Sequence, residues 1–197
     1  MVDSPTAPKQ YSGVTVSSTF TDLIEHRAAV IKALQANGLY PVAMENDDAK
    51  PEGDVVDSSL QMVRDGSAYI GIISKKYGQI PPSLVKNPES LSITELEFNE
   101  AIKQNRPVLL FIMGKEHLVH EDEIELDPAK RIKLEEFKSN AKKTESGLNR
   151  IYSVFNSLED FTVKVNTSVA RLKALLDTQN IQPTAISAPT VYCICKL

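Results

Sequence analysis

Short apolar runs alternate along the chain with longer segments in which apolar residues recur every three or four positions. Two of the runs, residues 67–73 and 108–112, are almost continuously apolar. That pattern is typical of strands buried on both faces of a parallel sheet. Shorter runs predict three further strands, at residues 13–16, 39–44 and 151–155.

The segments between these strands have the apolar spacing of helices, about one apolar residue per turn. They predict helices from Phe20 to the Asn37-Gly38 stop, around residues 56–63, over residues 92–104, from Pro128 onward, and from Ser157 to Leu176. In the helix that begins at Pro128, we expect Ile132, Leu134 and Phe137 to face the core.

Strands that alternate with helices predict an α/β fold with a doubly wound parallel sheet. We expect a flavodoxin-like, five-stranded sheet in the order 2-1-3-4-5. The expected core contains Val14, Val16, Ile70, Ile72, Leu109 and Phe111. Ligands of such sheets bind beyond the carboxyl ends of the strands, between strands one and three. Topology therefore directs attention to Ser17, Ser18 and Thr19, and to the loop 74–78 with Lys75, Lys76 and Tyr77.

The chain has 197 residues, enough for one sizeable core. Residues 1–10 contain two prolines and no periodicity, which predicts a flexible lead-in. Residues 11–177 carry the whole alternating pattern and form the expected domain. After residue 177 the pattern ends, so residues 178–197 are interpreted as a linker or a disordered tail.

Composition narrows the classes of function. The net charge of −4 and the lack of a basic stripe argue against nucleic acid as a partner. No apolar run is long enough for a membrane span, and no secretory signal is visible. Cys193 and Cys195 lie together near the C-terminus and cannot staple a fold. A reducing, cytoplasmic setting fits best.

Several common motifs are missing, including a phosphate-binding loop that ends in Gly-Lys-Ser/Thr and a Gly-x-Gly-x-x-Gly after the first strand. His117 and His120 form an H-x-x-H pair in an acidic loop. Imidazoles at that spacing suit a divalent metal with a nearby carboxylate, and a solvated loop is the simpler interpretation. We therefore predict no metal and no resident cofactor.

The segment Ser92-Ile-Thr-Glu95 is the most informative. It has the form of a capping box, in which a serine and a glutamate satisfy the first amides of a helix. The same spacing also places a carboxylate at the start of a helix that follows the third strand and its long loop. Glu97 and Glu100 are expected to face solvent.

Four stretches in this order resemble a TIR-like domain of unknown function that occurs at the N-terminus of many STAND-type NTPases and bacterial defence proteins. The resemblance covers roughly residues 11–177, and the four stretches are VTVSSTFTDLIEHR (14–27), PVAME (41–45), GIISKKYG (71–78) and SITELE (92–97). More remotely, residues 90–96 are similar to the catalytic segment of TIR domains and to the same helix start of nucleoside deoxyribosyltransferases.

The resemblance implies that Glu95 takes the place of the catalytic glutamate of NAD-cleaving TIR domains, with Ser92 in the place of the family's cysteine. Glu45, at the end of the second strand, is a second candidate. The substrate implied is NAD or a related nucleotide, and TIR-like domains also imply self-association and a STAND-type NTPase as a partner or fused module.

Three functions stay open at this point. The first is an effector that cleaves NAD between nicotinamide and ribose, with a carboxylate that stabilises the oxocarbenium ion and hydroxyls that hold ribose or phosphate. The second is a non-catalytic module for homotypic interaction. The third is a nucleoside transferase that uses Glu95 as a nucleophile at C1′ and needs an acid for the departing base.

Overall fold

The computed structural model describes residues 12–19, 21–43, 54–144, 146–147 and 150–180. The described residues form a five-stranded sheet in the order β2-β1-β3-β4-β5, and every neighbouring pair is parallel. The strands are β1 (Gly13–Ser18), β2 (Tyr40–Val42), β3 (Ala68–Ile73), β4 (Val108–Met113) and β5 (Ser153–Phe155). The flavodoxin-like order predicted from the sequence is therefore confirmed.

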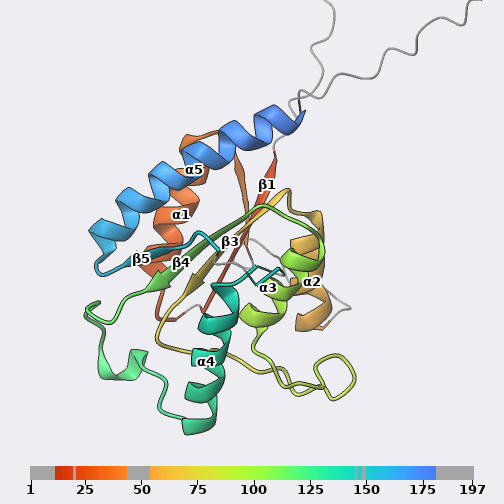
Figure 1. Ribbon diagram of the computed structural model, residues 1–197, viewed down its shortest axis with the longest axis vertical. Coiled ribbons are helices and arrows are strands. Elements are labelled where there is room, and N and C mark those ends of the chain that lie inside the picture. The colour runs from red at the N-terminus through yellow and green to blue at the C-terminus, as the bar shows by residue number, and fades with distance from the viewer. Residues whose placement is uncertain (1–11, 20, 44–53, 145, 148–149, 181–197) are drawn as a thin grey trace, which may run out of the picture.

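Helices cover both faces of the sheet (Figure 1). They are α1 (Ile24–Ala36), α2 (Val55–Asp65), α3 (Ile93–Lys103), α4 (Pro128–Ala141) and α5 (Leu158–Asn180), with a short 3-10 turn, η2 (Glu121–Glu123). Figure 1 shows α1 and α5 together on one face and α2 and α3 on the other. The domain thus has the three-layer arrangement that buries both faces of a parallel sheet.

Each face of the sheet has its own aromatic core. On the side of α1 and α5, the rings of Phe155 and Phe161 lie 4.7 Å apart between centroids. On the side of α3 and α4, the Phe98 ring lies 6.2 Å from Tyr69 and 5.6 Å from Phe137. These edge-to-face contacts fix how the helices sit on the sheet.

The predicted core is largely confirmed. Of the six expected core residues, five are buried and Leu109 is partly buried against them. The expectation for Ile132 was wrong, because its side chain is 62% exposed. Leu134 and Phe137 are buried as predicted. Helix α4 reaches the core only through a narrow stripe, and Ile132 lies two residues, or about 200° around the helix, from Leu134.

Some expectations concern residues outside the described ranges, including the lead-in, Cys193, Cys195 and Glu45. Helix α5 continues to Asn180, three residues beyond the boundary expected at residue 177. No helix among the described residues is long and apolar enough to cross a membrane.

Candidate functional site

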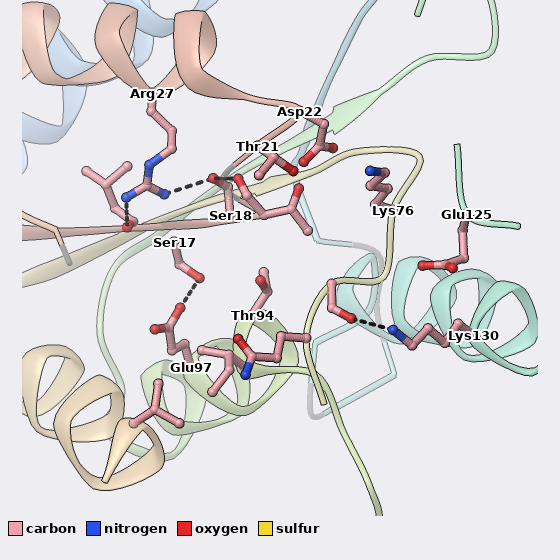
Figure 2. Close-up of a pocket in the computed structure, with 16 residues that line it drawn as sticks. Ser17, Ser18, Thr21, Asp22, Arg27, Lys76, Thr94, Glu97, Glu125 and Lys130 are labelled. Atoms are coloured by element: carbon pink, nitrogen blue, oxygen red, sulfur yellow. Dashed lines mark hydrogen bonds between the residues drawn. The ribbon is translucent and has the colours of Figure 1, made fainter. Parts of the chain in front are cut away.

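A cleft of about 780 Å³ opens where β1 and β3 end, the position expected from the topology. Its walls come from the end of β1, the start of α1, the loop after β3 and the first turns of α3, with one lysine from α4 (Figure 2). Its volume falls within the usual range of small-molecule sites, about 300–1,000 Å³.

A carboxylate from α3 lies at the floor of the cleft. Glu97 is only 4% exposed, and its Oε2 accepts a hydrogen bond from the Ser17 hydroxyl at the end of β1 (Figure 2). The expectation that Glu97 and Glu100 face solvent was therefore wrong. Both carboxylates lie on the inner side of α3, where Glu100 forms an ion pair with Arg64 of α2 at 2.7 Å.

A cation from α1 lies on the opposite wall. Arg27 is 5% exposed, and its Nη1 donates to the Ser18 Oγ at 2.8 Å. Its Nη2 lies 3.4 Å from the carbonyl oxygen of Val16, to which it donates. The Thr19 hydroxyl shares a 3.2 Å hydrogen bond with Ser74, which follows β3. The hydroxyl groups of Ser17, Ser18 and Thr19 thus form hydrogen bonds with α3, with α1 and with the residue that follows β3, respectively.

Asp22 also lines the cleft, and its carboxylate, unlike the side chains above, accepts no hydrogen bond from a described residue. Both of its carboxylate oxygens are buried, and neither has a hydrogen-bond partner among the residues that the structure describes. A buried carboxylate without a donor is costly, because it has lost its hydration without replacement. A ligand that brings a donor to Asp22 would remove this cost.

Two lysines line the part of the cleft farther from Glu97. Lys76 belongs to the loop after β3, and its ammonium forms no hydrogen bond or ion pair with another described residue. Lys130 of α4 donates to the Gly78 carbonyl oxygen at 3.2 Å (Figure 2). The cleft therefore has the Glu97 carboxylate near one end and two lysines near the other, and its lining also includes the carboxylates of Asp22 and Glu125 (Figure 2).

Glu95 lies elsewhere, in an internal network with Tyr77 and Ser92. It is 9% exposed and does not line the cleft. Its backbone N–H donates to the Ser92 Oγ at 3.3 Å, as in a capping box. The other half of the box is bridged by the Tyr77 hydroxyl, which accepts from the Ser92 N–H at 3.2 Å and donates to Glu95 Oε2 at 2.5 Å.

Burial governs the protonation of this network. It raises the pKa of the Glu95 carboxyl above its usual range, and the hydrogen bond from Tyr77 opposes the rise. Burial, with the hydrogen bond to Glu95, also raises the pKa of the Tyr77 hydroxyl. The polar groups of Tyr77, Ser92 and Glu95 thus form hydrogen bonds with one another at the start of α3.

The other predicted site residues divide between the cleft and its surroundings. Ser17, Ser18 and Thr19 line the cleft. Lys75 does not: its ammonium donates to the carbonyl oxygens of His117 at 2.6 Å and Lys115 at 3.4 Å. Its neighbour Lys76 lines the cleft instead.

The two histidines of the H-x-x-H pair differ in burial. His117 is buried and its ring packs against His26, 5.3 Å between centroids, whereas His120 is exposed beside η2. Within the described ranges, no group of three or more His, Cys, Asp or Glu side chains has an arrangement that could hold a metal ion.

Sequence reasoning missed Asp22 and Glu97. Thr19-Phe-Thr-Asp22 has the residue types of a helix cap, and no sequence signal distinguishes a capping carboxylate from one without a hydrogen-bond donor. For Glu97 a signal was available. The apolar Ala101 lies four residues later on the same face of α3 and is fully buried.

Comparison with known proteins identifies the family. The family model of the domain of unknown function DUF4062 matches residues 13–170. The chain belongs to this family. No curated protein matches the sequence. A solved structure of diflavin flavoprotein A3 from Nostoc sp. is similar to this DUF4062 domain, with 11% identity, a TM-score of 0.45, and coverage of 87% of this chain and 97% of that chain. Likeness at this level carries no information about a ligand.

The family match places the cleft within the DUF4062 domain itself. The end of β1, the start of α1, the loop after β3, α3 and Lys130 all lie inside residues 13–170. Every side chain that lines the cleft thus belongs to the region that defines the family.

Proposed function

We propose that this DUF4062 domain binds NAD or a related nucleotide in the cleft and hydrolyses the bond between C1′ of the ribose and nicotinamide, with Glu97 as the catalytic carboxylate. The observation that carries the proposal is the buried Glu97, held by the Ser17 hydroxyl at the floor of a nucleotide-sized cleft. Such a carboxylate provides negative charge where a cation develops.

The chemistry needs little from the protein beyond this charge. When the C1′–N bond breaks, its electron pair goes to the pyridinium nitrogen, and nicotinamide leaves as a neutral molecule. Water then adds to C1′ and gives up a proton to complete the ribose product. Glu97 stabilises the oxocarbenium-like transition state, and a fixed carboxylate does so without reorganisation.

The phosphates are assigned to the opposite part of the cleft. Lys76 brings an ammonium that has no partner among the residues described by the structure, and Ser18 and Thr19 bring hydroxyl groups at the end of β1. The first turn of α1, which follows them, has no side-chain cap on its amides. Uncapped amides at a helix start favour an anion.

The wider role rests on the resemblance noted from the sequence. TIR-like relatives imply an effector in a defence response that acts when its domains gather. We therefore expect nicotinamide release to rise more steeply than linearly with protein concentration, or on fusion to an oligomerising partner. A STAND-type NTPase is the proposed partner or fused module.

Nicotinamide release from NAD is the direct test, and α3 supplies a matched pair of variants. Glu97→Gln and Glu95→Gln each remove one negative charge from the same helix, two residues apart. The proposal expects release by the parent protein and by Glu95→Gln, and its loss in Glu97→Gln.

Two results would contradict the proposal. Equal activity in Glu97→Gln and the parent would remove Glu97 from catalysis, whereas loss in Glu95→Gln alone would return the role to Glu95. Absence of cleavage by the parent, even when oligomerised, would favour the non-catalytic interaction module.

A further inference from the structure

A second cavity of about 450 Å³ lies beside the cleft, between the start of α1, the loop after β4 and the start of α5. Thr21 and Asp22 line both hollows, so the short segment before α1 forms the wall between them. The NAD proposal does not use this cavity, and the following inference does not depend on that proposal.

The cavity is lined by buried polar groups that have no partner. His26 is 7% exposed and His117 is 8% exposed. The His26 Nε2, the His117 Nδ1 and both Asp22 carboxylate oxygens lack a hydrogen bond to any described residue. Buried polar atoms are nearly always paired, so three such side chains around one cavity point to a missing ligand.

Packing holds the two imidazoles in place. The His26 ring lies 5.2 Å from Phe155 and 5.0 Å from Phe161 between centroids, and the His117 ring lies 5.4 Å from Phe155. Rings confined by aromatic neighbours on the core side are not free to turn toward other partners. Their unpaired nitrogens are therefore a fixed feature of the cavity wall.

The charged residues that line the cavity are all acidic, and the Lys75 ammonium lies behind His117, where it donates to that residue's carbonyl oxygen. The carboxylates of the cavity are Asp22, Glu25 and Glu123. Burial, followed by the nearby His117, lowers the pKa of His26 to about 4, although Asp22 and Glu123 act in the opposite direction. Burial and Lys75 lower the pKa of His117. Both shifts favour the neutral imidazole, which has one N–H donor and one acceptor nitrogen, so each ring can offer an acceptor beside the carboxylates.

We propose that this cavity binds a small organic cation with a primary ammonium group, which donates to Asp22 and to the imidazole nitrogens of His26 and His117. An ammonium has three donors and no acceptor, which matches a wall of carboxylate oxygens and neutral imidazoles. It also neutralises part of the negative charge. A metal ion fits less well, since the described side chains form no metal-binding group.

Putrescine, a diamine, is the probe, and butanediol with the same carbon skeleton is the matched neutral control. Calorimetric titration of the full chain at neutral pH should show one putrescine site with a Kd tighter than about 1 mM and no comparable site for butanediol. Asp22→Asn keeps the shape and removes the charge, so it should weaken putrescine binding about tenfold or more. Glu97→Gln should bind putrescine like the parent.

A second measurement keeps the proposal testable if Asp22→Asn fails to fold. In the unaltered protein, putrescine should shift the imidazole NMR signals of His26 and His117, and butanediol should leave both signals nearly unchanged. Equal binding of diamine and diol, no binding of either, or unmoved His26 and His117 signals would each overturn the proposal. Binding of Zn²⁺ in place of putrescine would also overturn it and identify a metal site instead.

Discussion

Glu95 and Glu97 lie two residues apart in α3, yet their surroundings have opposite characters. Glu95 receives the Tyr77 hydroxyl in a closed network that completes the helix start. Glu97 receives the Ser17 hydroxyl from the far end of β1 and faces a cleft. Two residues correspond to about 200° of rotation in an α-helix, so the same residue type serves opposite sides of one element.

Lys75 and Lys76 repeat this contrast in the loop after β3. Lys75 is held by backbone carbonyl oxygens, whereas Lys76 lines the cleft. In both pairs, only one of the two charged residues lines the cleft. The comparison teaches that a sequence motif directs attention to a segment, and that packing decides which of its residues lines the cleft.

The largest expected effect separates the two glutamates in catalysis. Glu97→Gln should lower the rate of nicotinamide release by about 100-fold or more, because it removes the charge that stabilises the transition state. Glu95→Gln should stay within about threefold of the parent, since an amide oxygen still accepts from Tyr77. Rates at saturating NAD, measured with folded protein of matched melting temperature, test the difference.

The next effect concerns the internal network. Tyr77→Phe leaves the Ser92 N–H and the Glu95 carboxylate without their shared partner, so the free energy of unfolding should fall by about 1–3 kcal/mol. Urea denaturation measures this change. Tyr152→Phe is the control, because Tyr152 is 38% exposed and its change should stay within about 0.5 kcal/mol. Equal effects in the two variants would mean that the network contributes no stability.

The lysine pair should differ in affinity for the nucleotide. Lys76→Ala should weaken NAD binding about tenfold, the usual loss for one charged hydrogen bond. Lys75→Ala should bind NAD like the parent. Calorimetry in a Glu97→Gln background avoids turnover during the titration. A larger loss for Lys75→Ala would contradict the assignment of the phosphates to Lys76.

The smallest expected effect is a pH dependence of stability. Because the pKa of Glu95 is raised above its ordinary value of 4.5, the folded state holds its proton more tightly than the unfolded state does. The stability that this group contributes is present below that value and declines as the pH rises through the folded pKa. Melting temperatures of the parent should therefore fall relative to those of Glu95→Gln as the pH is raised from mildly acidic toward neutral. A difference that widens in favour of the parent would contradict the raised pKa.

The fold was predictable because its signals are local and repeated. The apolar runs of β3 and β4 show burial on both faces, and alternation with helices leads to the parallel order. The strand ends followed from topology, and Ser17, Ser18 and Thr19 do line the cleft. Ile132 failed because residue spacing alone does not tell how wide a stripe of α4 the sheet covers.

The site was less predictable because it depends on rotation and loop path. Whether Glu95 or Glu97 faces the cleft is decided by how α3 packs on α2 and β1, at residues far away in sequence. Which of Lys75 and Lys76 faces inward depends on the loop's backbone, which has no sequence period. The catalytic role of Glu95 stays a prediction, and Glu45 lies outside the described residues.

The hydrogen bond between Ser17 and Glu97 also has a consequence for the order of folding. The two residues are 80 positions apart, and β2 and β3, the strands that pair with β1, both come later in the chain. Contacts of such long sequence separation form slowly, after the entropy of closing a large loop has been overcome. A chain still emerging from the ribosome has no cleft until α3 has been made. Any activity of this site therefore begins only when more than half of the domain has been synthesised, and under the proposed function a chain that ends before α3 would release no nicotinamide.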